Sequence, residues 1–97
     1  MIADSVEANL GHLVQRLSPL SSLVSIRGSG AGRFLYIVCN GRSAEVSPAE
    51  EKWWVELWGS LEEDAQPEID VMLDSIAEVE VFLLDYFFPE GAQFSSF

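Results

Sequence analysis

The chain has 97 residues and a formal net charge of −11, which together indicate one small acidic domain over residues 1–97. Hydrophobic residues make up 48% of the sequence, so the chain can build a core and lacks the composition of a disordered protein. Residues 1–44 carry four Arg against two acids, a charge of +2, and residues 45–97 carry one Lys against 14 acids, a charge of −13. Nucleic acid and anionic membrane are therefore not expected partners, because binding phosphate requires a basic surface.

Cysteine usage and the apolar runs favour a reducing compartment. Cys39 is the only cysteine, so no internal disulfide can form. Met1 to Asp4 contains no basic segment followed by an apolar stretch, so no signal peptide is expected. No apolar run approaches the roughly 20 residues that a membrane-spanning helix needs. We therefore expect a cytoplasmic protein.

The first half of the chain predicts one helix and two strands. Apolar residues at helical spacing predict a helix over residues 4–17, with Asp4 and Glu7 as a capping box at its start. Alternation predicts a strand over 22–27. The glycine-rich segment 28–32 leads into a strand rather than a helix, which favours a turn over a phosphate-binding loop. The unbroken apolar run from Phe34 to Cys39 predicts a central strand.

Asn40-Gly41 is the preferred dipeptide of a type I′ turn, because both residues tolerate positive φ. A two-residue turn fixes the register, so that Cys39 pairs with Arg42 and Leu35 with Val46. The predicted core face then comprises Leu35, Ile37, Cys39, Ala44 and Val46. The opposite face combines aromatic and polar side chains: Phe34, Tyr36, Val38, Ser43, Glu45 and Ser47.

Residues 47–61 carry two conflicting signals. Ser47-Pro48-Ala49-Glu50 is typical of a helix start, and the apolar residues that follow fit a helical stripe. The dense aromatic content of residues 53–58 instead favours a strand, and Gly59 would weaken a helix. We favour a second hairpin, with Ala49 to Lys52 as its turn. Trp53 would then lie on one face, and Trp54, Glu56 and Trp58 on the other.

The last third of the chain predicts a loop, a strand and a helix. Residues 62–67 form an acidic loop without the ligand spacing of a calcium site. Alternation predicts a strand over 68–73. Ser75 and Glu78 form a capping box for a helix whose apolar stripe reaches Phe87, with Glu80 and Asp85 on its far side. In the tail, Phe94 and Phe97 are candidates for docking on a groove.

The expected fold class is α+β in the order α-β-β-β-β-β-α. Four or five mainly antiparallel strands form one layer, and the N- and C-terminal helices pack on one of its faces. No catalytic, metal or cofactor site is expected. His12 stands alone on a helix, Cys39 is expected to be a small buried residue, and the acids show no sign of burial and convergence. An enzyme is the least favoured class.

The strongest functional hint is the aromatic content of the face turned away from the helices. Phe34, Tyr36, Trp54, Glu56 and Trp58 are the candidate partner-binding residues, because Trp and Tyr are common interface anchors. The favoured function is a non-catalytic protein-binding module, such as a small bacterial adaptor, inhibitor, immunity-type or chaperone-like protein, that uses an aromatic face rimmed by acids. Its partner is another protein, with a basic one favoured by charge. A self-associating homodimer and an acidic mimic of nucleic acid are the alternatives.

Overall fold

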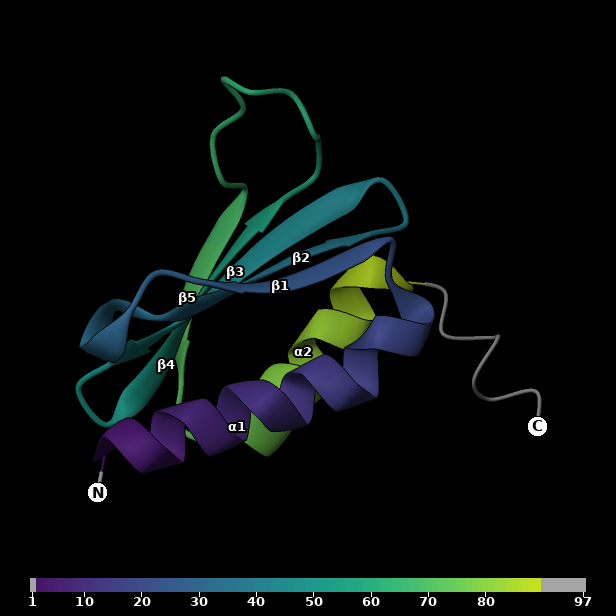
Figure 1. Cartoon of the computed structure of the whole chain (residues 1–97). Coiled ribbons are helices and arrows are strands. Elements are labelled where there is room, and N and C mark those ends of the chain that lie inside the picture. Colours follow the sequence, from purple (N-terminus) through teal and green to yellow (C-terminus); the bar gives the residue numbers. More distant parts are fainter. Residues whose placement is uncertain (1, 90–97) are drawn as a thin grey trace.

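The computed structural model describes the backbone of residues 2–89 and the side chains of residues 8–30 and 32–89. Five antiparallel strands form one sheet in chain order, and both helices cover the same face of it (Figure 1). The expected fold class is confirmed. The elements are α1 (Ile2–Leu17), β1 (Leu23–Arg27), β2 (Phe34–Cys39), β3 (Arg42–Ala49), β4 (Lys52–Trp58), β5 (Ile69–Leu73) and α2 (Ile76–Phe87), with short 3-10 turns at Ser18–Leu20 and Gly30–Gly32.

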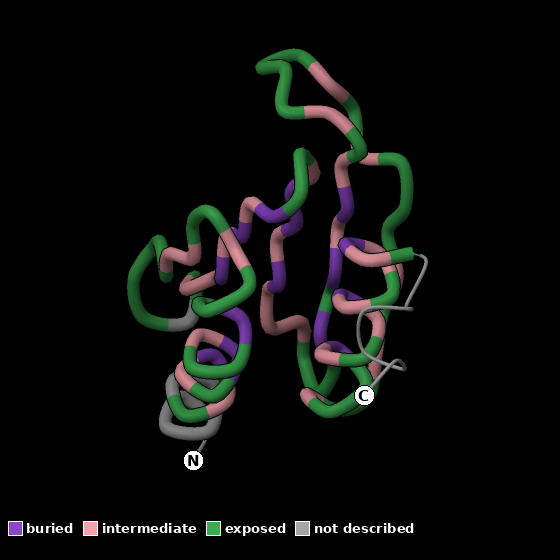
Figure 2. The backbone as a smooth tube through the Cα atoms, turned by 90° about the vertical axis from the view of Figure 1, so that its right-hand side faces the viewer, coloured by how far each residue is buried: buried purple, intermediate pink, exposed green. Residues whose placement is uncertain are grey.

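The β2–β3 hairpin has the predicted turn and register. Asn40 and Gly41 both adopt positive φ, at 55° and 78°. Cys39 pairs with Arg42 and Leu35 with Val46. All five predicted core-face residues of this hairpin are at most 1% exposed. Figure 2 shows the buried residues along the central strands and on the sides of the helices that face them.

The second hairpin is confirmed over residues 42–58, against the competing helix signal. Ala49 pairs with Lys52 around a two-residue turn, in which Glu50 has a φ of 61°. Alternate residues of β4 extend the buried face of β3, which a helix in this place would interrupt. Pro48 is tolerated because β2 begins only at Phe34, so residue 48 lies past the end of its neighbour and needs no ladder hydrogen bond there.

The two helices differ from expectation in two details. α1 begins at Ile2, so Asp4 lies inside the helix and is not its N-cap, and the side chains of the predicted capping box lie outside the described residues. Glu80 does not face away from the core layer. It accepts a hydrogen bond from Arg16 Nε at 3.0 Å and lies 3.4 Å from His12 Nε2. The reason is that α1 and α2 lie side by side on the sheet, so the flank of α2 meets α1.

The start of α2 and its buried stripe are as predicted. Ser75 and Glu78 form the expected capping box, and Val79, Leu83 and Phe87 are at most 1% exposed. Phe94 and Phe97 lie outside the described residues.

The tip of the β2–β3 hairpin is hydrogen-bonded to the last turn of α2 and to the 3-10 turn that follows α1. Asn40 donates its side-chain amide to the carbonyl of Phe87 at 2.8 Å, and Arg42 Nη1 donates to the carbonyl of Tyr86 at 2.5 Å. These carbonyls belong to the last turn of α2 and lack partners within the helix. Cys39 donates its thiol to the carbonyl of Leu20 at 3.2 Å, and burial raises the pKa of that thiol. One strand end therefore positions both helical segments.

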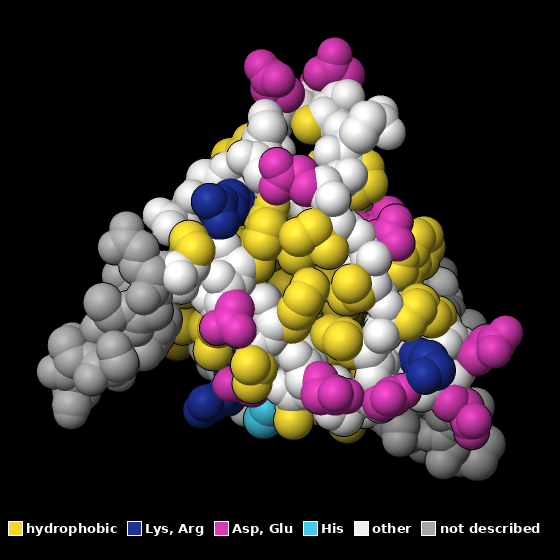
Figure 3. All heavy atoms as spheres, turned by 180° about the vertical axis from the view of Figure 1, so that it is seen from behind, with side chains coloured by type: hydrophobic (Ala, Val, Ile, Leu, Met, Phe, Trp, Pro, Cys, Tyr) yellow, Lys and Arg dark blue, Asp and Glu magenta, His cyan; other side chains and the backbone are white. Residues whose placement is uncertain are grey.

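Some apolar side chains stay exposed at the border of the sheet. They include Leu23 and Ile26 on β1, and Ile69 and Met72 on β5. Val81 on α2 is 60% exposed. Figure 3 shows the side of the molecule on which such side chains gather over β5 and α2, with acids around them.

We predict that Asn40 has two separable contributions to stability. Asn40→Gly keeps a residue that tolerates positive φ but removes the amide that caps Phe87, and should lower the free energy of unfolding by about 1 kcal/mol. Asn40→Ala also introduces the strain of a left-handed backbone and should cost roughly 1 kcal/mol more. Urea denaturation of the three proteins measures both steps, and equal stability of the two variants would contradict the prediction.

Candidate functional site

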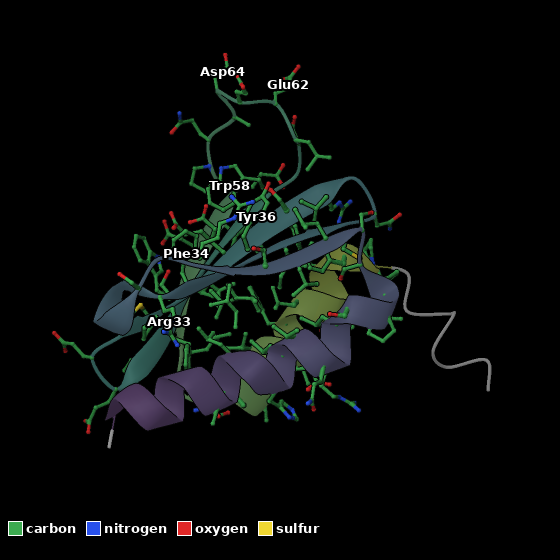
Figure 4. The ribbon with its side chains drawn as sticks, viewed as in Figure 1. Arg33, Phe34, Tyr36, Trp58, Glu62 and Asp64 are labelled. Carbon is green, nitrogen blue, oxygen red and sulfur yellow. The ribbon has the colours of Figure 1, made fainter. Side chains whose placement is uncertain are left out.

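The candidate site is the open face of the sheet, which we define as the face turned away from α1 and α2. All five residues predicted for partner binding lie on it. Trp54 is 40% exposed, and Phe34, Tyr36, Glu56 and Trp58 are half-buried. In Figure 4, Phe34, Tyr36 and Trp58 lie above the sheet, whereas Arg33 extends toward the helix side.

Three acids form a line across the middle of the open face. Glu45 on β3 pairs with Glu56 on β4, and Glu56 pairs with Asp70 on β5. We call Glu45, Glu56 and Asp70 the carboxylate row. The strands that carry these neighbours lie about 4.8 Å apart. Among the described side chains, no Lys, Arg or His forms an ion pair with any of the three. Like charges placed directly opposite in a sheet repel each other, so the row is unfavourable in the isolated chain.

Glu56 is the centre of this row and its protonation is perturbed. Desolvation by burial raises the pKa of Glu56, and the charges of Glu45 and Asp70 raise it further. A folded-state pKa above the unfolded value means that the folded protein binds the proton more tightly. This group therefore lowers stability as the pH rises through its folded pKa, and the penalty is largest at neutral pH.

Aromatic rings stand on both sides of the carboxylate row. Trp54 and Trp58 precede and follow Glu56 by two residues, which places each about 7 Å along the strand from it. Tyr36 continues the line of the row onto β2, opposite Glu45. The guanidinium of Arg27 lies over the Tyr36 ring, 4.3 Å from its centroid. This pair shows that the edge of the open face already accommodates a cation stacked on an aromatic ring.

The arrangement differs from the expected aromatic face with acids at its rim. Phe34 and Trp54 are separated by the intervening strand β3, where Ser47 pairs with Trp54. The acids run through the middle of the face and the aromatic rings lie around them. The surface is therefore suited to a group that is both cationic and able to stack, rather than to a purely apolar one.

The acidic loop between β4 and β5 adds charge to one end of the open face. A hollow of about 350 Å³ lies between this loop and the sheet. Tyr36, Glu45 and Trp58 line it from the sheet together with Ser43, and the loop contributes Ser60, Leu61, Glu62, Glu63 and Ala65. In Figure 4, Glu62 and Asp64 stand at the far end of the loop, above the strands. The loop is thus a wall of the candidate site as well as a solvated connection.

Sequence reasoning missed Glu45, Asp70, Glu62 and Glu63 as site residues. Glu45 was placed on the correct face, but its pairing with Glu56 follows only once the second hairpin is known to turn in two residues. Asp70 joins the row through the β4–β5 register, which a long loop does not fix in advance.

In the described part of the chain, no group of His, Cys, Asp and Glu could hold a metal ion. Cys39 is buried on the helix side, and the exposed His12 lies beside Glu80. Neither α1 nor α2 has the length and apolar character needed to cross a bilayer.

We predict that Glu56→Gln stabilises the protein at neutral pH. The substitution removes two cross-strand repulsions while keeping the size of the side chain, so the free energy of unfolding should rise by about 1 kcal/mol. The gain should shrink as the pH falls and protonates Glu56 in the wild type, because both proteins are then neutral at this position. Thermal unfolding as a function of pH measures this. Glu63→Gln, on the exposed loop, is the control, and a destabilised Glu56→Gln protein would refute the repulsion.

Comparison with known proteins gives no further guide to function. No protein-family model, curated protein or solved structure matches the chain.

Proposed function

We propose that this chain is a non-catalytic protein-binding module whose open face holds a basic segment of a partner protein. The observation that carries the proposal is the carboxylate row, a line of like charges that has no ion-pair partner among the described side chains and is bordered by tryptophan rings. Roles of this kind include an adaptor, an inhibitor or a chaperone-like protein.

The electrostatic support is that a cation relieves a repulsion already present in the free protein. An arginine or lysine side chain laid on Glu56 would contact carboxylates on both neighbouring strands. The bound cation would attract the carboxylates that otherwise repel one another. The free energy of binding then includes the relief of that repulsion. The rest of residues 45–97 is also acidic, which favours the approach of a basic partner from a distance.

The aromatic rings give the surface selectivity for shape as well as charge. The partly exposed rings of Trp54 and Trp58 would stack against the alkyl part or the guanidinium of a basic side chain. Large, stiff aromatic side chains lose little conformational entropy on binding, which is why they anchor many interfaces. A partner that presents arginines spaced along an extended segment would use several strands at once.

We predict that short basic peptides bind the open face weakly and specifically. The probe is an acetylated, amidated Arg-Gly-Arg peptide, followed by amide chemical shifts and tryptophan fluorescence. Shifts should concentrate on β2 to β5 of the open face, and affinity should fall with added salt. The double variant Glu45→Gln/Glu56→Gln should weaken binding by about fivefold or more, since partly exposed charge pairs contribute up to about 1 kcal/mol each.

The matched control removes the same charge elsewhere. Glu51→Gln/Asp85→Asn changes the β3–β4 turn and the exposed side of α2, and should leave the affinity for the peptide nearly unchanged. Equal weakening by both double variants would reduce the effect to general charge attraction and would count against the proposal. In the source cell, a photo-crosslinking residue in place of Trp54 should capture a reproducible partner, and Glu45→Gln/Glu56→Gln should abolish that capture.

A further inference from the structure

A second surface, separate from the open face, lies where β5 meets α2. We define the β5–α2 patch as Ile69, Val71, Leu73, Ala77, Val81 and Phe82. A groove of about 430 Å³ passes along Leu73, Ala77, Val81 and Phe82, with Glu78 and Asp85 beside it. Val81 is 60% exposed and Ile69 is 40% exposed. Figure 3 shows these apolar side chains as one area bordered by acids. A continuous apolar area on so acidic a protein marks an interaction surface.

The same area includes the outer strand β5, which forms one edge of the sheet. Residues 69–73 contain no proline or lysine and pair with β4 in a regular register, and Asp70 is their one charged residue. Just before the strand, Glu68 donates its N–H to the Leu57 carbonyl at 2.7 Å. The two-residue turns at 40–41 and 50–51 set which residues of each strand bond to which neighbour. Counting outward from those turns, the backbone groups of Val71 point toward β4. The N–H and C=O groups of Asp70 and Met72 point to the free edge.

The residue pattern of β5 is complementary to itself in one register. Antiparallel pairing of two copies centred on Val71 places Asp70 opposite Met72 of the second copy. Centring on Asp70 instead opposes two copies of Asp70 at the axis, and centring on Met72 opposes Asp70 and Asp74, both of which cost free energy through like charge. The Val71 register has a like-charge pair only beyond the ends of β5, where Asp74 faces Glu68 of the second copy. The Val71 register also uses the free backbone groups of Asp70 and Met72, and aligns Ile69 with Leu73 on the helix side.

We propose that two copies of the chain associate through β5 about a two-fold axis at Val71, joining their sheets into one. The helices fit this arrangement. α2 packs on β4 and β5 and lies nearest the β5 edge at its start, because its last turn reaches the β2–β3 tip at Asn40 and Arg42. The groove along Leu73 and Ala77 and the exposed Val81 lie beside this edge, so the two patches meet across the two-fold axis.

The dimer uses the β5 edge and α2, whereas the partner would bind the open face, and the two surfaces meet only at Asp70 and Met72. Salt separates the two. Two chains of charge −11 repel each other, so added salt should tighten the dimer, whereas it should weaken the binding of a basic peptide. Loss of one property leaves the other measurable.

Sedimentation equilibrium over a concentration series tests the association, and we expect a particle of twice the chain mass. Val81→Lys places a charge in the patch at an exposed helix position. It also lowers the net negative charge, so repulsion between the two copies falls and cannot explain a weaker dimer. Met72→Pro removes a backbone N–H that points to the free edge, and it also replaces an exposed side chain on the open face. Each should raise the dimer dissociation constant at least tenfold. Leu23→Lys makes the same charge change on β1 and should leave the dimer intact.

Cross-linking tests the register itself. In a Cys39→Ala background, Val71→Cys places two thiols across the axis at a separation that a disulfide can span, and copper-catalysed air oxidation should give a covalent dimer. Ile69→Cys is the control. It lies on the same face and is exposed, but in this register it faces Leu73 of the second copy, so it should cross-link at least tenfold more slowly.

Four results would overturn the proposal. The first is a monomer at every concentration and salt level. The second is a dimer that survives both Val81→Lys and Met72→Pro with circular dichroism unchanged. The third is a dimer lost in Leu23→Lys, which would assign the contact to β1. A monomer that instead binds an extended peptide of another protein along β5 would also overturn it.

Discussion

The register of the β2–β3 hairpin is the constraint on which the rest of the molecule depends. Asn40 and Gly41 both adopt positive φ, and the resulting two-residue turn leaves no freedom in how the strands align. This alignment places Leu35, Ile37 and Cys39 under the helices and assigns Tyr36 to the other side. The same turn carries Asn40 to the end of α2. A shift of one residue would exchange the two faces of the sheet and break the contacts with both helical ends.

How much of the fold could be predicted depended on how local its determinants are. The first hairpin and the α2 capping box are set by a few adjacent residues, and both were predicted residue by residue. The segment around Pro48 was ambiguous, because its helix-start signal is equally local and only the pairing of β4 with β3 and β5 decides against it. The position of Glu80 beside Arg16 depends on packing between residues 64 apart, which no local pattern encodes.

The candidate site shows the same limit. The face that carries Tyr36, Trp54 and Trp58 followed from alternation along each strand. The carboxylate row did not, because it arises from three strands aligned together. Its acids lie far apart in the sequence and look like ordinary surface residues. They become neighbours only when the β3–β4 and β4–β5 registers are fixed. A site formed by residues of several neighbouring strands is harder to predict from a sequence than one formed by alternate residues of a single strand.

The two proposed surfaces depend on different kinds of interaction. The open face carries charge that is unfavourable until a cation arrives, so its binding energy is electrostatic and sensitive to salt. The β5–α2 patch carries little charge of its own, and its association depends on apolar burial and on backbone hydrogen bonds. Because Asp70 and Met72 lie on the open face at the β5 edge, joining two sheets there would bring two carboxylate rows into one extended surface.

The order of the strands in the sheet is also their order along the chain, and this has a consequence for folding. Every strand pair joins neighbours in sequence, so even the longest connection, residues 59–68, closes at a small entropic cost. The sheet can therefore assemble by successive addition, starting from the turn at Asn40-Gly41. α2 follows all five strands in the chain, so the part of the apolar underside that α2 covers can be closed only after these strands have been made.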